Sequence, residues 1–173
     1  MSHLYVLRHT KIKNPHGLCY GRTDMPLATT YPSEKRSIFD RLPKIDLTFS
    51  SPSNRCWQLA NDLNQGICSK DERLLELDFG DWEGRPWSEI SPEETKTWID
   101  DIVSTPCPNG ESFDNLCERI DQFICSLQKR NEDILIVTHG GPIKAFYHHL
   151  NGLTKLEAIN LDIPYGTLSS FKP

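Results

Sequence analysis

Two apolar segments of this chain each end abruptly at a histidine. Residues 4–7 are followed by Arg8 and His9, and residues 134–137 lead through a threonine to His139 and two glycines. Short apolar runs of this kind, rich in β-forming residues, predict strands that are buried on both faces of a sheet. Ligand sites in open α/β sheets lie beyond the carboxyl ends of the strands. We therefore expect His9 and His139 to meet at one edge of the sheet.

A third apolar segment, residues 45–49, predicts another strand that brings an arginine to the same edge. Ser51 and Pro52 follow it as the predicted N-cap and first position of a helix that runs to about residue 63. Arg55 then falls in the first turn of this helix, where backbone amides and the helix dipole also favour an anion. Two histidines and two arginines at one edge predict a binding site for a phosphate dianion, whereas one of them alone would more often be a solvated residue at a strand end.

Helical spacing of apolar residues continues in the rest of the chain. It predicts helices at about residues 32–42, 92–103, 113–129 and 142–150, a loop at 10–27 and a last strand at 167–171. The helix at 113–129 has the clearest apolar face, which marks it as part of the core. Residues 85–112 leave the alternation of strands and helices, so we expect them to be an excursion that covers the site.

Four acids lie among apolar residues in the segment 74–84, namely Glu76, Asp78, Asp81 and Glu83. A carboxyl group in such surroundings can have a raised pKa and act as a proton donor. The sequence does not decide between Glu76 and Glu83 for this role. The alternative is an acidic loop around the buried side chain of Trp82, with no part in chemistry.

Length and charge narrow the classes of function. With 173 residues the chain is long enough for one domain with a sizeable core. Its net charge of −5 at pH 7, without a basic stripe, argues against nucleic acid as a partner. No apolar run is long enough to span a bilayer, and the N-terminus enters a strand without a targeting segment. We therefore expect a cytoplasmic protein that binds neither nucleic acid nor membrane.

The six cysteines are expected to be reduced structural thiols, because a cytoplasmic chain of this size does not need disulfides. No cysteine or histidine pair has the spacing of a zinc site, so the sequence predicts no metal. No cysteine is followed by five residues and an arginine, the loop that a cysteine-dependent phosphatase would use. The sequence also has no GxxxxGK[ST] loop, which counts against a P-loop nucleotidase.

Four segments together resemble the histidine phosphatase superfamily, also called phosphoglycerate mutase-like. They are LRHT at residues 7–10, SPSNR at 51–55, ELDFG at 76–80 and THGG at 138–141, in the family's order and spread over nearly the whole chain. Three further segments, YGRTDMPL at 20–27, FGDWEGRPW at 79–87 and NGESF at 109–113, resemble the α-ribazole phosphatase branch. That branch removes a 5′-phosphate during assembly of the cobalamin nucleotide loop.

The resemblance implies a three-layer α/β/α sandwich with a mostly parallel central sheet. It implies a single domain over residues 1–173, with a short lid at about 85–112. The partner it implies is a small-molecule phosphate monoester, namely α-ribazole 5′-phosphate or the 5′-phosphate of cobalamin. The sequence leaves the oligomeric state open, a homodimer included.

The resemblance also implies a reaction. His9 attacks phosphorus and becomes phosphorylated, and Glu76 protonates the leaving alkoxide and then takes a proton from water. Arg8, Arg55 and His139 neutralise the phosphoryl oxygens. No metal or cofactor is implied, because cationic side chains provide the charge that a metal provides elsewhere. The other phosphate-binding residues carried over from the family are Asn14, Arg22 and Gly140.

Two departures from the family pattern concern the loop after His9. Thr10 stands where the family has glycine, which bears on how the backbone at His9 is held. The loop is one residue shorter than the mutase pattern, so Asn14 matches the family's phosphate-binding asparagine only across a gap.

Three alternatives remain open at this point. A phosphoglycerate mutase is less favoured, because mutases carry a longer insertion between the positions of Glu76 and His139. A broad-specificity sugar-phosphate or fructose-bisphosphate phosphatase fits the same motifs, and so does a non-catalytic module that binds phosphoryl ligands. We favour α-ribazole 5′-phosphate because at least one of Trp82, Trp87 and Trp98 is expected to offer an aromatic face to its base, although each of them alone would more often be a packing residue.

Overall fold

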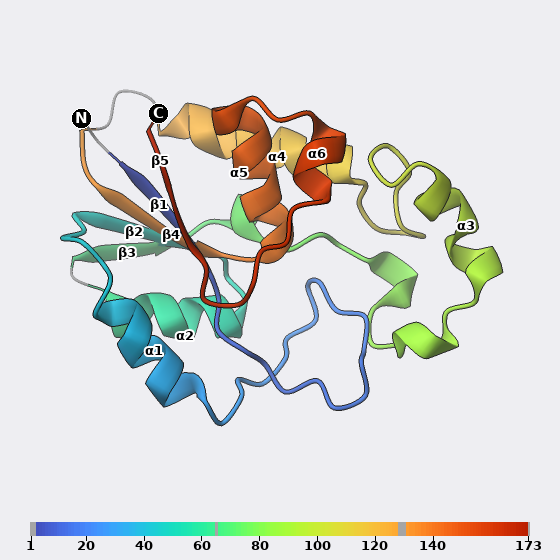
Figure 1. Ribbon diagram of the computed structural model, residues 1–173, viewed down its shortest axis with the longest axis horizontal. Coiled ribbons are helices and arrows are strands. Elements are labelled where there is room, and N and C mark those ends of the chain that lie inside the picture. Colours follow the sequence, from blue (N-terminus) through green and yellow to red (C-terminus); the bar gives the residue numbers. More distant parts are fainter. Residues whose placement is uncertain (1–2, 65, 128–130, 173) are drawn as a thin grey trace.

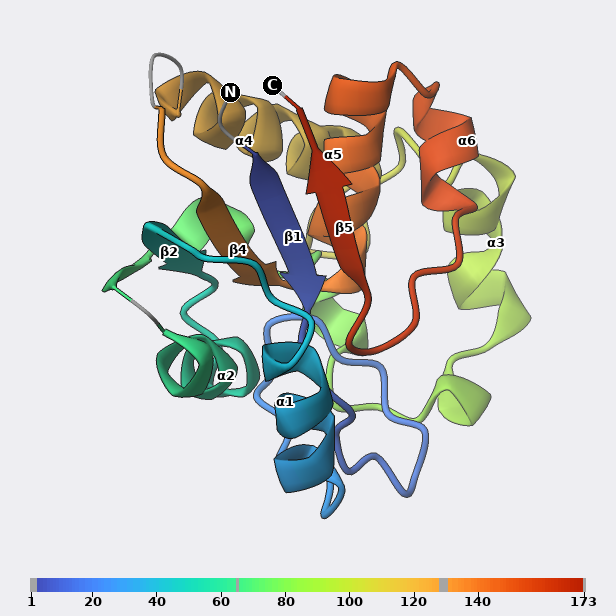
Figure 2. The same cartoon turned by 60° about the vertical axis from the view of Figure 1, so that its left-hand side comes forward.

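The computed structural model describes residues 3–64, 66–127 and 131–172, and these are built around a mixed sheet (Figure 1). Within these residues the sheet has five strands, in the spatial order β3-β2-β4-β1-β5. The parallel strands are β1 (Leu4–Arg8), β2 (Leu47–Ser50), β3 (Ile67–Lys70) and β4 (Ile134–Thr138). β5 (Leu168–Phe171) lies antiparallel beside β1, as Figure 2 shows. The prediction of a mostly parallel sheet is confirmed.

Helices cover both faces of the sheet, which gives the predicted three layers (Figure 1, Figure 2). α1 (Tyr31–Phe39) and α2 (Asn54–Leu63) lie on one face. α4 (Phe113–Ser126) and α5 (Gly140–Asn151) lie on the other, and α6 (Lys155–Ile159) packs beside α5. α3 (Pro92–Asp100) stands away from the sheet, at the right of Figure 1.

Side chains of the two central strands alternate between two cores. In β1, Leu4 and Val6 belong to the core beneath α4 and α5, whereas Leu7 belongs to the core with α1 and α2. β4 repeats the pattern with Ile136 and Val137. Successive side chains of a strand point to opposite faces, so a strand covered by helices on both sides must be apolar throughout. This requirement explains the two unbroken apolar runs of the sequence.

The register of β1 and β4 brings their carboxyl ends to the same level. Arg8 lies opposite Thr138, so the next residues, His9 and His139, leave the sheet side by side. The backbone N–H of His9 donates to the carbonyl oxygen of Thr138 at 3.0 Å and extends this pairing by one residue. β2 ends nearby on the other side of β4, so the chain enters α2 from the same edge.

Several element boundaries differ from the prediction. α1 ends at Phe39 and α3 at Asp100, each about three residues early. α4 ends at Ser126, and residues 128–129 of its predicted range lie outside the described residues. α5 begins at Gly140, two residues before the predicted start. β3 and α6 were not predicted.

The predicted start of α2 is wrong in a way that matters for the site. The helix begins at Asn54 with Ser53 at the N-cap position, so Ser51 and Pro52 lie before it. The hydroxyl of Ser51 is therefore not engaged as a helix cap. Instead its Oγ lies 2.8 Å from Nε2 of His139.

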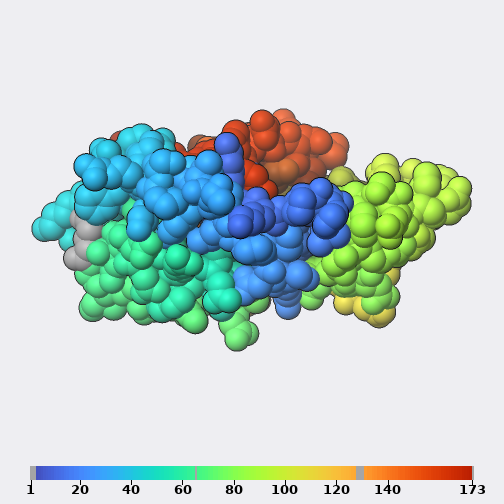
Figure 3. Space-filling model, turned by 90° about the horizontal axis from the view of Figure 1, so that it is seen from below, coloured from blue at the N-terminus to red at the C-terminus, as the bar shows by residue number. Residues whose placement is uncertain are grey.

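Residues 85–112 project from the sheet and its helices, as the yellow-green segment at the right of Figure 3 shows. Ser91 caps α3 through a capping box with Glu94, as the sequence predicted. The rings of Trp98 and Trp82 meet edge to face, with centroids 5.5 Å apart. This aromatic contact joins the projecting segment to the segment that carries the candidate acids.

Candidate active site

His9 and His139 lie beside each other at the carboxyl ends of β1 and β4. Their ring centroids are 5.2 Å apart and the ring planes are inclined at 71°. Both residues are buried, His9 with 1% and His139 with 0% of its surface exposed. The structure therefore brings the two histidines together, and neither is a solvated strand end.

The ring of His9 is held with one nitrogen turned away from the backbone. Its Nδ1 lies 2.8 Å from the carbonyl oxygen of Thr10. Because a carbonyl only accepts hydrogen bonds, Nδ1 carries the proton and Nε2 keeps its lone pair. Burial, and after it the charge of Arg55, lowers the pKa of His9 to about 3. His9 is thus neutral near pH 7, which is the state that a nitrogen nucleophile needs.

His139 is held by residues around the start of α2. Its Nε2 lies 2.8 Å from Oγ of Ser51 and 3.5 Å from the sulfur of Cys56. The Cys56 thiol also donates to the carbonyl oxygen of Thr138 at 3.4 Å. Burial, followed by the charge of Arg55, holds the pKa of His139 well below its ordinary value. The contacts of Ser51 and Cys56 with the histidine were not predicted from the sequence.

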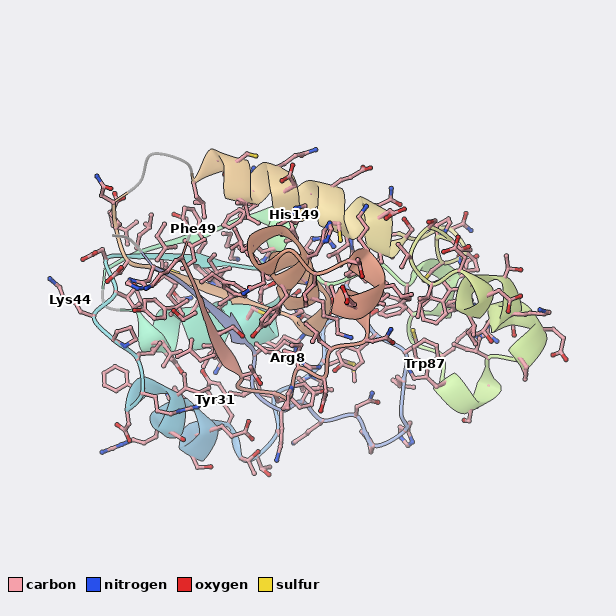
Figure 4. The ribbon with its side chains drawn as sticks, turned by 45° about the horizontal axis from the view of Figure 1, so that its top comes forward. Arg8, Tyr31, Lys44, Phe49, Trp87 and His149 are labelled. Atoms are coloured by element: carbon pink, nitrogen blue, oxygen red, sulfur yellow. The ribbon has the colours of Figure 1, made fainter. Side chains whose placement is uncertain are left out.

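Each arginine is held by the backbone of a loop that lies elsewhere in the chain. Arg55 is 1% exposed and donates to the carbonyl oxygens of Gly21 and Thr23. Arg8 donates to the carbonyl oxygen of Ile163. Figure 4 shows Arg8 near the middle of the molecule, where β1 ends. The two guanidinium groups therefore reach the histidines from separate parts of the chain.

Three buried polar atoms of this cluster have no hydrogen-bond partner among the described residues. They are Nε of Arg8, Oγ1 of Thr10 and Nε of Arg55. A buried polar group without a partner costs about 1–3 kcal/mol, so such atoms are rare in folded proteins. Their concentration beside the two histidines indicates a site for an oxyanion, whose oxygens accept hydrogen bonds from guanidinium groups.

Comparison with known proteins agrees with this geometry. The sequence profile of the Histidine phosphatase superfamily (branch 1) matches residues 4–173. The chain belongs to the histidine phosphatase superfamily.

Two relatives and one solved structure of the superfamily are named for the reactions that they catalyse, and the chain is similar to each of them. The chain is 26% identical to Phosphoserine phosphatase 1 of Hydrogenobacter thermophilus over 164 residues. This alignment covers 88% of this chain and 78% of the relative. Over 186 residues it is 28% identical to the 2,3-bisphosphoglycerate-dependent phosphoglycerate mutase of Rhizobium etli, covering 95% and 87%. The crystal structure of the α-ribazole phosphatase from Shigella flexneri matches with a TM-score of 0.89 at 25% identity, covering 97% of this chain and 89% of that chain. These findings support a phosphatase or mutase reaction.

Glu76 and Glu83, which the sequence did not separate, have different surroundings in this superfamily member. Glu83 accepts hydrogen bonds from the backbone N–H groups of Arg22 and Thr23 at 2.8 and 2.6 Å. Burial acts to raise the pKa of Glu83, but hydrogen bonds to its carboxylate, led by that of the Thr23 hydroxyl, hold the pKa below its ordinary value. Glu76 accepts from the backbone N–H of Gly141 at 3.0 Å and lines a cavity that Arg8 also lines. Glu83 thus fixes a loop, whereas Glu76 faces the cavity.

The other predicted phosphate-binding residues lie in three different settings. The side-chain amide of Asn14 bonds to the backbone of Leu18 in its own loop, at 2.8 and 2.9 Å. Arg22 lies 3.2 Å from a carboxylate oxygen of Glu111. Gly140 is the first residue of α5 and lies next to the side chain of Arg8. Of the three, only Gly140 lies against a member of the histidine–arginine cluster in these contacts, and roles in phosphate binding stay predictions for all of them.

A cavity of about 320 Å³ opens beside Arg8 and Glu76. Its walls are mostly apolar and come from α4, α5, the segment after α6 and the projecting segment. Of the three tryptophans considered above, Trp98 lines this cavity. Trp82 is buried in the core, and Trp87, labelled in Figure 4, is 42% exposed and belongs to the projecting segment. An aromatic side chain therefore borders the space next to the oxyanion site.

Three further observations concern the described residues as a set. They contain no group of three or more histidine, cysteine or acidic side chains that could hold a metal ion. None of the helices they form is both long and apolar enough to cross a membrane. The six cysteines are free thiols.

Proposed function

We propose that this protein is a phosphomonoesterase that acts through a phosphohistidine on His9. The observation that carries the proposal is the state of His9. Its ring is neutral and oriented, and it lies where Arg8 and Arg55 have buried nitrogen atoms without a partner among the described residues. A neutral imidazole next to fixed positive charge can attack an anionic phosphoryl group that the same charge holds in place.

The proposed reaction has two steps. In the first, Nε2 of His9 attacks phosphorus, the bond from phosphorus to the alcohol oxygen breaks, and protonated Glu76 gives its proton to the leaving oxygen. In the second, Glu76 takes a proton from water, and the water oxygen attacks phosphorus to release phosphate and neutral His9. Arg8, Arg55 and His139 surround the phosphoryl oxygens and stabilise their charge.

The two guanidinium groups supply the positive charge that divalent cations supply in other phosphoryl-transfer sites. The proposed reaction is therefore independent of metal ions and of any cofactor. Its partner is a small-molecule phosphate monoester.

For the substrate we propose α-ribazole 5′-phosphate. The mostly apolar cavity beside Arg8 and Glu76 suits an alcohol with an apolar aromatic base, and Trp98 offers it an aromatic surface. Stacking of a base on an aromatic side chain contributes about 1–3 kcal/mol. The similarity in fold to a protein named as an α-ribazole phosphatase supports the same substrate.

Phosphoserine is the second candidate. The chain is similar to a phosphoserine phosphatase, and Lys144 and Asp162 in the cavity lining carry charges that match the carboxylate and the ammonium group of an amino acid. The apolar character of the remaining wall favours the larger aromatic alcohol. A mutase reaction and a broad sugar-phosphate phosphatase are the remaining candidates.

The test is the ratio kcat/KM for a panel of α-ribazole 5′-phosphate, phosphoserine, AMP, fructose bisphosphate and 3-phosphoglycerate. We expect α-ribazole 5′-phosphate to be preferred by roughly 10-fold or more. Equal values throughout would leave a generic phosphatase. Transfer of phosphate between the 2- and 3-positions of phosphoglycerate, faster than its hydrolysis, would indicate a mutase, and failure to hydrolyse even p-nitrophenyl phosphate would indicate a binding module.

A pair of variants connects the preference to the cavity. Trp98→Ala should lower kcat/KM for α-ribazole 5′-phosphate by roughly 5- to 100-fold, because a stacked base loses its partner. The value for p-nitrophenyl phosphate should change less. Trp57→Ala is the matched control, because Trp57 lies on α2 against Lys70, whose ammonium nitrogen is 4.6 Å from the ring centroid.

A further inference from the structure

Two tyrosines join the loops that hold the two arginines of the site. The hydroxyl oxygens of Tyr20 and Tyr165 lie 2.6 Å apart, although the residues are 145 positions apart in the chain. Tyr20 precedes Gly21, whose carbonyl oxygen accepts a hydrogen bond from Arg55. Tyr165 belongs to the loop between α6 and β5, whose Ile163 accepts from Arg8. The hydroxyl–hydroxyl bond therefore connects the two loops directly.

Each tyrosine ring also faces the arginine that its own loop holds. Cζ of Arg8 lies 4.1 Å from the ring centroid of Tyr165, and Cζ of Arg55 lies 5.4 Å from that of Tyr20. Within about 6 Å an aromatic face attracts a guanidinium group. The ring of Tyr165 is also 5.5 Å from the ring of His9. The tyrosine pair thus borders both arginines and the proposed nucleophile.

The loop of Tyr165 holds the backbone at the end of β1 as well. The N–H of Gly166 donates to the carbonyl oxygen of His9 at 3.2 Å. The N–H of Arg8 donates to the carbonyl oxygen of Thr167 at 2.9 Å. A shift of this loop would move Arg8 and His9 together.

We propose that Tyr20 and Tyr165 form a clamp that fixes the separation of the Arg8 and Arg55 guanidinium groups, so that they bind one phosphoryl group from two sides. Arginine side chains have many rotamers, and ordering them when a ligand binds weakens the binding. The clamp does this ordering in advance. Both tyrosines are positioning residues, because they act through the arginines. The identity of the anion as a phosphoryl group rests on the proposed function.

The test uses Tyr20→Phe, Tyr165→Phe and the double variant. Phenylalanine keeps the ring and removes only the hydroxyl group, so each single variant breaks the same hydrogen bond. We expect kcat/KM for p-nitrophenyl phosphate to fall about 3- to 10-fold in each single variant, with a similar rise in the Kd for inorganic phosphate measured by calorimetry. The double variant should lose no more of kcat/KM and of phosphate affinity than the more affected single variant, because the hydrogen bond can be lost only once.

Two controls separate positioning from general stability. Tyr147→Phe removes a hydroxyl that bonds to Ser169 at 3.1 Å, between α5 and β5, and should leave both quantities at the wild-type values. Tyr165→Leu removes the face against Arg8 as well, and should weaken phosphate binding further than Tyr165→Phe. All measurements are made well below the Tm of each variant, where a purely structural role leaves the Kd for phosphate unchanged.

The outcomes are distinct. Phosphate binding and turnover at wild-type levels in both phenylalanine variants, or losses that add in the double variant, would overturn the clamp. Variants that bind phosphate more weakly in a protein that hydrolyses no ester would support the clamp and reject the proposed function. A wild-type protein that neither binds phosphate nor hydrolyses esters would overturn both.

Discussion

The carboxylate of Glu76 accepts a hydrogen bond from the backbone N–H of Gly141, 3.0 Å away, in the first turn of α5. His139 is the N-cap residue of the same helix. This hydrogen bond fixes the position of the Glu76 side chain relative to α5. A single junction between β4 and α5 therefore positions both His139 and the proposed proton donor.

This contact predicts a strong effect of Gly141→Ala. A Cβ atom at this position would overlap the carboxylate of Glu76 and lie 3.1 Å from Cδ1 of Leu116. Because displacement of a reacting group by about 1 Å can cost 10²-fold in rate, we expect kcat/KM to fall by roughly that factor. At Gly140 the added Cβ would lie 3.6 Å from the nearest atoms of Arg8, so Gly140→Ala should cost less. Steady-state assays of the two variants make the comparison, and a Gly141→Ala enzyme of wild-type activity would contradict it.

Glu76→Gln should slow the reaction in a way that depends on the leaving group. For an alkyl phosphate the loss should be roughly 10²- to 10⁴-fold, because the alkoxide needs a proton. p-Nitrophenolate leaves without one, so the variant should still release a burst of p-nitrophenol before slow hydrolysis of the phosphohistidine. Stopped-flow absorbance measures the burst. An equal loss in the first step for both esters would remove Glu76 from the role of proton donor.

Glu83→Gln is the matched control for that variant. Its carboxylate holds the backbone of Arg22 and Thr23, and the carbonyl of Thr23 accepts from Arg55 at 2.9 Å. We expect a lower Tm and weaker phosphate binding, with no dependence on the leaving group. A leaving-group dependence in Glu83→Gln and none in Glu76→Gln would exchange the two assignments.

The central strands could be predicted from the sequence because burial on both faces requires an unbroken apolar run. β3 could not be predicted in this way. It is a four-residue edge strand, and Ile67 at its start is 69% exposed. α6 has only five residues, too few for helical periodicity, although Thr154 and Glu157 form a capping box at its start.

The residues around the histidines were predictable only where a strand end or a helix start fixed them. Glu76 and Glu83 lie in one turn-rich segment, and only three-dimensional contacts separate a carboxylate that fixes a loop from one that faces the cavity. Tyr165 lies in an irregular loop far along the chain, with no periodic pattern to place it. Thr10, which differs from the family's glycine, has a buried hydroxyl without a partner among the described residues. The sequence noted this departure but did not indicate where the hydroxyl would lie.

His9→Ala should abolish turnover, with a loss of roughly 10³-fold or more, because it removes the nitrogen that is proposed to attack phosphorus. Rapid quenching with a radiolabelled ester should give an acid-labile, base-stable label on the wild type and none on this variant. His139→Ala should lose much of the rate but keep its fold and the label. His16→Ala, in the exposed part of the loop, is the control. Normal turnover by His9→Ala would refute the phosphohistidine mechanism.

Activity should survive exhaustive treatment with EDTA. The positive charge at the proposed site comes from Arg8 and Arg55, which a chelator does not remove. The measurement is kcat/KM before and after dialysis against EDTA, with and without added Mg²⁺. A loss that Mg²⁺ restores would show that a cation takes part.

Folding stability should fall with decreasing pH because of His9. Its pKa is about 3 in the folded protein, mainly because of burial, whereas an unfolded histidine has a pKa of about 6.5. Above pH 6.5 neither state is protonated, and the full stability is present. Between about pH 6.5 and 3 only the unfolded chain binds the proton, so the free energy of unfolding falls by about 1.4 kcal/mol per pH unit for this residue. Urea unfolding of the wild type and His9→Asn at pH 7 and pH 5 isolates the effect, because the other titrating groups are shared. The wild type should lose about 2 kcal/mol more than the variant between these pH values, and parallel curves would mean that His9 takes up its proton in the folded state.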